Sequence, residues 1–112
     1  MQIVIHDNNL SLGEVVHKHA LNRLVYELSN YDAQILSVVV GFSQGNDHND
    51  IDYKFCKLRI DSDRFKEIII EEKSSDFFTA IDIATDKARR ITIGRIIQQN
   101  FYSGHNYSYS LT

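Results

Sequence analysis

A long amphipathic helix in the last third of the chain constrains the fold most. Residues 74–76 are polar and typical of a helix N-terminus, and the helical pattern after them continues to about Gln99. At about 100° per residue, the apolar positions form one narrow stripe. Its members are Phe77, Ile81, Ala84, Ala88 and Ile91. The two alanines permit close approach to a sheet, so this stripe predicts a helix with one side in the core.

The part of the chain before this helix predicts four strands. Residues 3–5 form a short apolar run, and residues 34–42 are β-branched and apolar on both faces, as in a central strand. Residues 53–60 and 65–72 alternate between apolar and polar positions, with a polar loop predicted at residues 43–52.

A first helix lies between the first two strands. Ser11 and Glu14 have the spacing of a capping box, so we expect this helix to begin near Leu12 and to end around residues 29–32. Apolar residues then recur at the helical period, and they are Leu12, Val16, Ala20, Leu24 and Leu28. His17, Asn22 and Glu27 are predicted to point outward.

The third and fourth strands predict a hairpin whose register follows from parity. A three-residue loop at residues 62–64 would pair Leu58 with Ile68. The same loop would place Cys56 opposite Ile70 and would leave Arg59 next to Glu67. A slip of one residue would turn the apolar set to solvent.

These elements predict an α+β fold in the order β-α-β-β-β-α. Such an order favours a four-stranded sheet with two helices packed on one face and the other face exposed. With 112 residues, 43% of them hydrophobic, we expect one domain over residues 1–100. A polar, aromatic C-terminal tail follows at residues 101–112, and the sequence leaves its order open.

The charges are divided along the chain. Residues 1–86 hold 8 basic and 15 acidic side chains, although the whole chain has a net charge of only -3. After Asp86 there are four cations and no acid. Such a segment can contact phosphates in a protein that is acidic overall.

Several short motifs carry a resemblance to a known family. The second helix reads Asp-Phe-Phe-Thr-Ala-Ile-Asp at residues 76–82 and Asp-Lys-Ala-Arg-Arg at residues 86–90. The chain opens with Met-Gln-Ile-Val-Ile-His-Asp-Asn-Asn, and Ser-Leu-Gly-Glu-Val follows at residues 11–15. In this order, over roughly residues 1–95, the chain resembles the short form of the ribosome hibernation-promoting factor and ribosome-associated inhibitor family.

The resemblance implies a stress-related inhibitor of translation that performs no reaction and uses no cofactor. Members of this family bind the small ribosomal subunit in the channel used by messenger and transfer RNA. For this chain it implies phosphate contacts with the 16S rRNA from Lys87, Arg89 and Arg90, assisted by Lys18 and Arg23. A soluble, cytoplasmic protein is expected.

A second interpretation stays open, because residues 91–97 are largely apolar where the family often has lysines. Ile83, Ile93 and Ile97 fall on the side of the second helix opposite its core stripe, which is typical of a partner surface. The alternative is a diverged family member that acts as a protein-interaction or homodimerising module without ribosome binding.

Two further groups of cations have other predicted surroundings. Arg95 falls on the core-facing stripe and is expected to lie beyond the edge of the sheet. Lys57 and Arg59 are expected on the exposed sheet face, beside Glu67 and Glu71, where opposite charges neutralise one another.

Catalytic and metal-binding motifs are weak. Residues 41–45 match the G-x-S-x-G pattern of serine hydrolases, but a polar loop and another strand follow instead of a helix. The acidic loop at residues 47–52 lacks the glycine and glutamate of a calcium site. His17 and His19 lie two apart on a helix and so point in different directions.

Cys56 lies in an apolar alternation and is expected in the core. No run of about 20 apolar residues predicts a membrane span.

Overall fold

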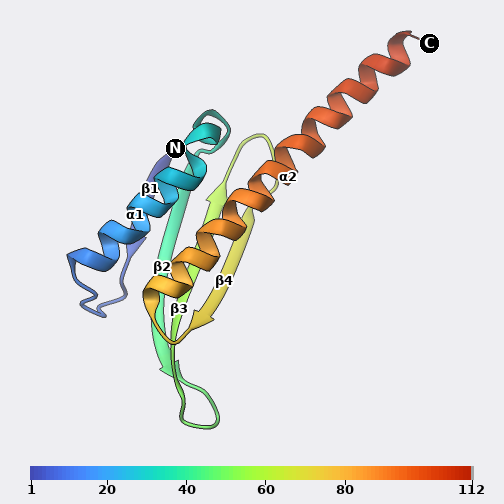
Figure 1. The fold of residues 1–112 in the computed structure, drawn as a ribbon. Coiled ribbons are helices and arrows are strands. Elements are labelled where there is room, and N and C mark those ends of the chain that lie inside the picture. Colours follow the sequence, from blue (N-terminus) through green and yellow to red (C-terminus); the bar gives the residue numbers. More distant parts are fainter. Residues whose placement is uncertain (112) are drawn as a thin grey trace.

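A computed structural model of the chain describes the backbone of residues 1–111 and the side chains of residues 1–100 (Figure 1). Its elements are β1 (Gln2–His6), α1 (Glu14–Leu28), a 3-10 helix η1 (Ser29–Gln34), β2 (Ser37–Asn46), β3 (Asp52–Asp61), β4 (Ile68–Ser74) and α2 (Phe77–Leu111). This order confirms the predicted α+β fold.

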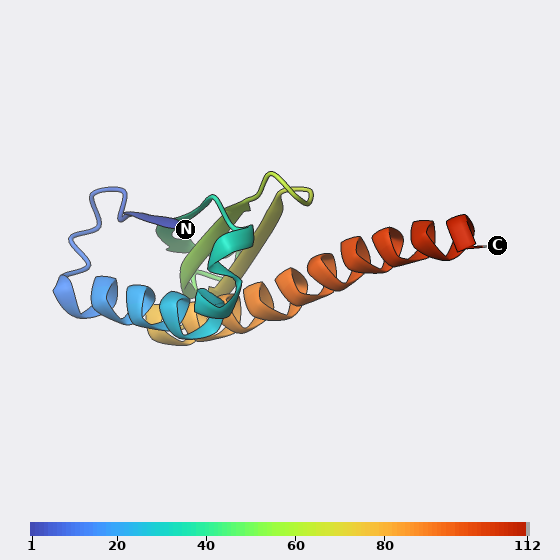
Figure 2. The same cartoon turned by 90° about the horizontal axis from the view of Figure 1, so that it is seen from above.

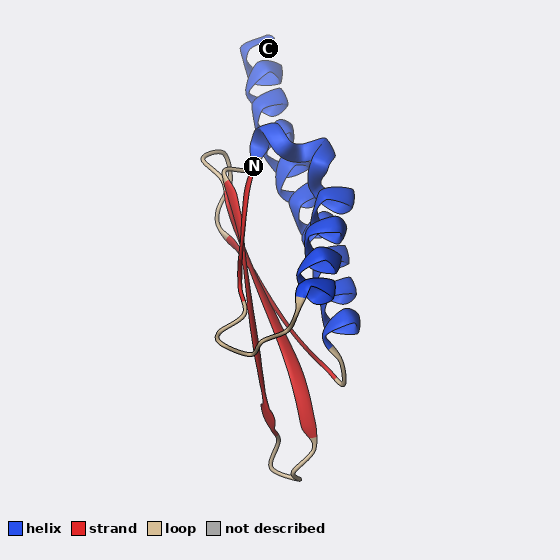
Figure 3. Ribbon diagram, turned by 90° about the vertical axis from the view of Figure 1, so that its left-hand side faces the viewer, coloured by secondary structure: helices blue, strands red, loops and turns tan. Residues whose placement is uncertain are grey.

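The four strands form one mixed sheet in the order β1-β2-β3-β4. β1 runs parallel to β2, and the other neighbouring pairs are antiparallel. Both helices lie on one face of the sheet and the opposite face is open, as Figure 3 shows with the sheet seen edge-on. The predicted arrangement of the layers is therefore correct.

The core lies between the sheet and the two helices. Alternate residues of the strands point into it, because successive side chains in a strand lie on opposite faces. From the sheet these include Val38, Val40, Phe42, Cys56, Leu58, Ile60, Ile68 and Ile70; from the helices, Val16, Ala20, Leu24, Leu28, Phe77, Ala80, Ile81, Ala84 and Ala88. The rings of Phe42 and Phe77 meet edge to face at 5.4 Å.

The β2–β3 hairpin is longer than predicted. Both strands continue through residues that were expected to form a loop, and only residues 47–51 connect them. Gly45 pairs with Tyr53 on the neighbouring strand, and the hydroxyl of Tyr53 lies 2.8 Å from where a Cβ atom of residue 45 would be. Three carboxylates, those of Asp47, Asp50 and Asp52, gather at the tip of the hairpin.

The predicted register of β3 and β4 was wrong by two residues. Leu58 pairs with Ile70 and Ile60 pairs with Ile68, because the connection between the strands is longer than three residues. A shift of two preserves the parity, so the predicted apolar face is the one that is buried.

Two expectations for α1 were also wrong. Ser11 does not cap the helix; it has a φ of 53°, Gly13 precedes the first helical residue with a φ of 84°, and no side chain caps this end. Glu27, predicted to point outward, is only 7% exposed, because α2 packs beside α1 and covers it.

α2 begins as predicted and ends later. The carboxylate of Asp76 accepts a hydrogen bond of 2.8 Å from the backbone N–H of Thr79, which is the geometry of an N-cap. The helix extends beyond Gln99 to Leu111 and leaves the sheet on the way (Figure 2). Ile91 is 36% exposed and Thr92 is buried instead. The division into a domain and a tail at residue 100 remains a prediction.

Candidate nucleic-acid interface

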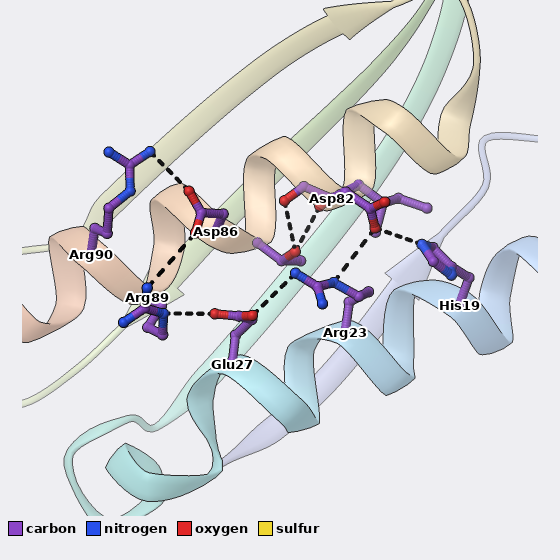
Figure 4. A network of polar contacts seen from close by, with 9 residues as sticks. His19, Arg23, Glu27, Asp82, Asp86, Arg89 and Arg90 are labelled. Atoms are coloured by element: carbon purple, nitrogen blue, oxygen red, sulfur yellow. Dashed lines mark hydrogen bonds and ion pairs between the residues drawn. The ribbon is translucent and has the colours of Figure 1, made fainter.

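The two helices are joined along their outer seam by a row of alternating charges (Figure 4). At its centre lies the carboxylate of Glu27. Its Oε1 accepts a hydrogen bond of 3.1 Å from Nη2 of Arg23, and its Oε2 accepts one of 2.8 Å from Nε of Arg89. One buried acid therefore orients a guanidinium from each helix, and both guanidinium groups remain partly open to solvent.

The row of charges continues from this centre in both directions. Towards the start of α2, Asp82 lies 3.5 Å from Nε of Arg23 and 2.7 Å from Nε2 of His19. In the other direction, Asp86 lies 3.8 Å from Arg89 and 3.0 Å from Arg90. We call these seven residues, His19, Arg23, Glu27, Asp82, Asp86, Arg89 and Arg90, the helix seam.

Lys87 and Lys18 lie outside the helix seam. Lys87 pairs with Glu72 on β4, on the side of α2 away from α1. Lys18 is exposed on α1 and has no ion pair among the side chains that the structure describes. The structure thus brings Arg23, Arg89 and Arg90 together, while Lys87 and Lys18 point to different surroundings.

The cations of the open sheet face are paired as predicted. Lys57 lies 3.9 Å from Glu71 on β4, and Arg59 lies 3.2 Å from Asp61 and 3.7 Å from Glu67. All these side chains are about half-exposed or less. Opposite charges across strands neutralise this face locally.

A third group of cations lies at the end of the sheet where α2 leaves it, and sequence reasoning did not find it as a group. Arg64 and Lys66 belong to the β3–β4 connection, and Nη1 of Arg95 donates a hydrogen bond of 3.2 Å to the carbonyl of Lys66. This position confirms that Arg95 lies beyond the sheet. In the sequence, Arg64 and Lys66 are about 30 residues from Arg95 and stand among acids, so no local pattern marked them.

The predicted partner surface on α2 is partly exposed. Ile83 is 38% exposed and Ile97 is 61% exposed, whereas Ile93 is half-buried. Arg90 and Asp86 lie among them on the helix surface. The stripe is therefore mixed, with charges between its apolar members.

Two solved structures have a fold similar to that of this chain. Over 93% of this chain and 99% of the other, the structure superimposes on that of a ribosomal subunit interface protein from Coxiella burnetii, with a TM-score of 0.64 and 13% identity. It also matches the N-terminal domain of Protein Y from Thermus thermophilus, with a TM-score of 0.60 and 20% identity, over 80% of this chain and 93% of that domain. The chain has the fold of these two proteins. No family model and no curated protein matches the sequence.

The acidic loop at residues 47–52 and the two histidines of α1 make local contacts within the fold. Oδ1 of Asp47 accepts hydrogen bonds from the backbone N–H groups of Asn49 and Ile51 at 2.8 and 3.0 Å. This carboxylate therefore stabilises the turn between β2 and β3. His17 and His19 face different carboxylates, those of Asp7 and Asp82. Within residues 1–100, no three side chains of metal-ligating type are grouped to hold an ion.

Cys56 is buried in the core as expected. Burial, and to a smaller extent the nearby carboxylate of Glu72, raises the pKa of its thiol to about 12. A thiol of that pKa is not a nucleophile near neutral pH. Among the described residues, no helix is long and apolar enough to cross a membrane.

Proposed function

We propose that this protein binds the small ribosomal subunit and inhibits translation by occluding the channel used by messenger and transfer RNA. The observation that carries the proposal is a likeness of fold over nearly the whole chain to a ribosomal subunit interface protein. The helix motifs at residues 76–82 and 86–90 support the same function, because they occur on the helix that carries the candidate cations.

The mechanism is steric and needs no reaction. Arg23, Arg89 and Arg90 of the helix seam present guanidinium groups to solvent, and a guanidinium can bind a phosphate through two N–H groups. Arg90 is the most exposed of them, at 60%. Its surface pair with Asp86 is worth about 0–1 kcal/mol, so a phosphate of the 16S rRNA can replace or share that partner.

Lys18 and Lys87 would extend this contact on the two sides of the helix seam. Lys87 is 44% exposed although it pairs with Glu72, and a lysine reaches phosphates as a mobile point charge. Because the contact would depend on cations and phosphates, binding should weaken as salt rises.

Co-sedimentation of the purified protein with small ribosomal subunits, at low and at raised salt, tests this function. We expect saturable binding that weakens with salt and is weakened by Arg90→Glu. The matched control is Arg59→Glu, which makes the same charge change at a paired arginine on the open sheet face. Absence of binding at every salt concentration would contradict the proposal.

The exposed isoleucines of α2 favour a second candidate function, a protein-interaction or homodimerising module. Ile97 and Ile83 would form the apolar part of that contact, with Ile93 between them in the sequence. Such a contact should resist salt and be weakened by Ile97→Asp. Sedimentation equilibrium over a range of concentrations measures it, and a monomer at all concentrations would argue against a homodimer.

A further inference from the structure

A pocket lies where the β3–β4 connection meets α2, at the end of the sheet. It has a volume of about 370 Å³ and is lined by Phe65, Lys66, Arg95, Gln98 and Gln99. We call it the loop–helix pocket. The hydrogen bond from Arg95 to the carbonyl of Lys66 ties its two walls together.

The electrostatics of the loop–helix pocket differ from those of the helix seam. Arg23, Arg89 and Arg90 are each held by a carboxylate. In contrast, Lys66, Arg95 and the neighbouring Arg64 contact no carboxylate among the side chains of residues 1–100. Three cations without a carboxylate partner therefore belong to this end of the molecule. Lys18, Lys54 and Lys73 also lack a carboxylate partner among the described side chains, but they lie on α1 and towards the other end of the sheet.

The acids near the pocket do not cancel this charge. Arg59, on the open sheet face, holds Asp61 at 3.2 Å and Glu67 at 3.7 Å. Asp63 is then the one exposed carboxylate of the connection without a partner among the described side chains. α2 contributes no acid from residue 87 onward, so a polyanion lying along the helix beyond the pocket meets no repulsion from it.

The lining of the pocket fits a nucleic-acid strand. Arg95 uses one N–H for the loop carbonyl, and its other donors remain for a phosphate, as does the ammonium of Lys66. Gln98 and Gln99 are exposed and carry amide donors and acceptors for base edges. Phe65 packs against the core and is partly exposed, and an aromatic ring is a group on which a base can stack.

We infer that the loop–helix pocket binds a phosphodiester and the adjoining base of a single-stranded RNA segment. The choice of RNA as the polyanion rests on the proposed function. The location of the site rests only on the unpaired cations, the amides and the aromatic ring. It places the strongest phosphate contact at Lys66 and Arg95 and not at the arginines of the helix seam.

The test is a titration of the ¹⁵N-labelled protein with a single-stranded oligouridylate at low salt, followed by NMR. We expect shifts at the backbone amides of Phe65, Lys66 and Arg95 and at the side-chain amides of Gln98 and Gln99. Lys66→Gln and Arg95→Gln should each raise the Kd about three- to tenfold and lower the salt slope by about 0.7. Lys66 is exposed and outside the core, so its variant keeps the fold.

Lys57→Gln is the matched control, because it removes one positive charge from the open sheet face and leaves the pairs of Arg59 with Asp61 and Glu67 in place. The inference is overturned if the control weakens binding equally, if the shifts map to other residues, or if no shifts occur. It is also overturned if inorganic phosphate at the same concentration reproduces them. Because no ribosome is present, this result can be read separately from co-sedimentation, which tests the proposed function.

Discussion

Oε2 of Glu27 on α1 accepts a hydrogen bond of 2.8 Å from Nε of Arg89 on α2. The same carboxylate binds Arg23 through Oε1. A residue that is 7% exposed thus joins the two helices and neutralises two of the candidate RNA-binding cations. Its replacement should affect stability and RNA binding in opposite directions.

We predict that Glu27→Gln lowers the free energy of unfolding by about 1–2 kcal/mol, measured by urea denaturation. The reason is the loss of two charge-assisted hydrogen bonds. Each contributes less to the free energy of unfolding than a fully buried pair would, because both arginines are partly exposed to solvent. The same change should strengthen binding to small subunits about threefold, since Arg23 and Arg89 lose their shared counter-charge. Glu71→Gln, a surface acid, should change stability by less than about 0.5 kcal/mol. Unchanged stability in Glu27→Gln would contradict the structural role.

Asp76 caps α2, and its removal should destabilise the start of that helix. Hydrogen bonds from the backbone N–H and the hydroxyl of Thr79 hold the pKa of Asp76 below its ordinary value. A lowered pKa means that the stabilisation is present above the ordinary value of 3.8 and is lost as the pH falls through the folded pKa.

Asp76→Ala should therefore lower the Tm by a few degrees at pH 7, with a smaller difference at pH 2.5. Thermal unfolding followed by circular dichroism measures both. Thr79→Ala, which keeps the backbone donor, should have a smaller effect at pH 7. An equal Tm difference at the two pH values would show that the ionised carboxylate is not the stabilising form.

Cys56 should be unreactive in the folded protein. With its pKa raised to about 12 and its side chain buried, we expect a thiol reagent at pH 8 to modify it at least about a hundredfold more slowly than in the chain unfolded by guanidinium chloride. Reaction within tenfold of the unfolded rate would mean that the core opens readily at β3.

Ala84 allows α2 to approach the sheet closely. It is fully buried, so Ala84→Leu should cost about 1–3 kcal/mol by overpacking, measured by urea denaturation. Ala33→Leu makes the same change at an exposed position of η1 and should be nearly neutral. A stable Ala84→Leu variant would indicate unfilled space beneath α2.

The fold was largely predictable because periodicity reports directly on burial. The helical period of α2 found Phe77, Ile81, Ala84 and Ala88, and all four are buried. It failed at Ile91, where the buried side of the helix turns to Thr92, because a periodic pattern carries no information about the direction in which a partner surface runs beneath the helix. Parity found the buried face of β4, but not its register, because loop length is independent of parity.

The candidate site was less predictable, because charge pairing is a tertiary property. A helical wheel places Arg89 on a flank of α2, yet nothing in the wheel shows that Glu27, distant in the sequence, will meet it. The third group of cations was missed for the same reason. Arg95 becomes part of a pocket only when the β3–β4 connection folds against it.

The β2–β3 connection, which carries Asp47 and Asp50, and the β3–β4 connection, which carries Arg64 and Lys66, lie at opposite ends of the sheet (Figure 1). This separation of acids from cations contributes to the electric dipole of the molecule. In the field of a polyanion such a dipole experiences a torque before any contact is made. The protein should therefore meet its partner with the α2 end leading and the hairpin trailing, so that salt slows its association more than it speeds its dissociation.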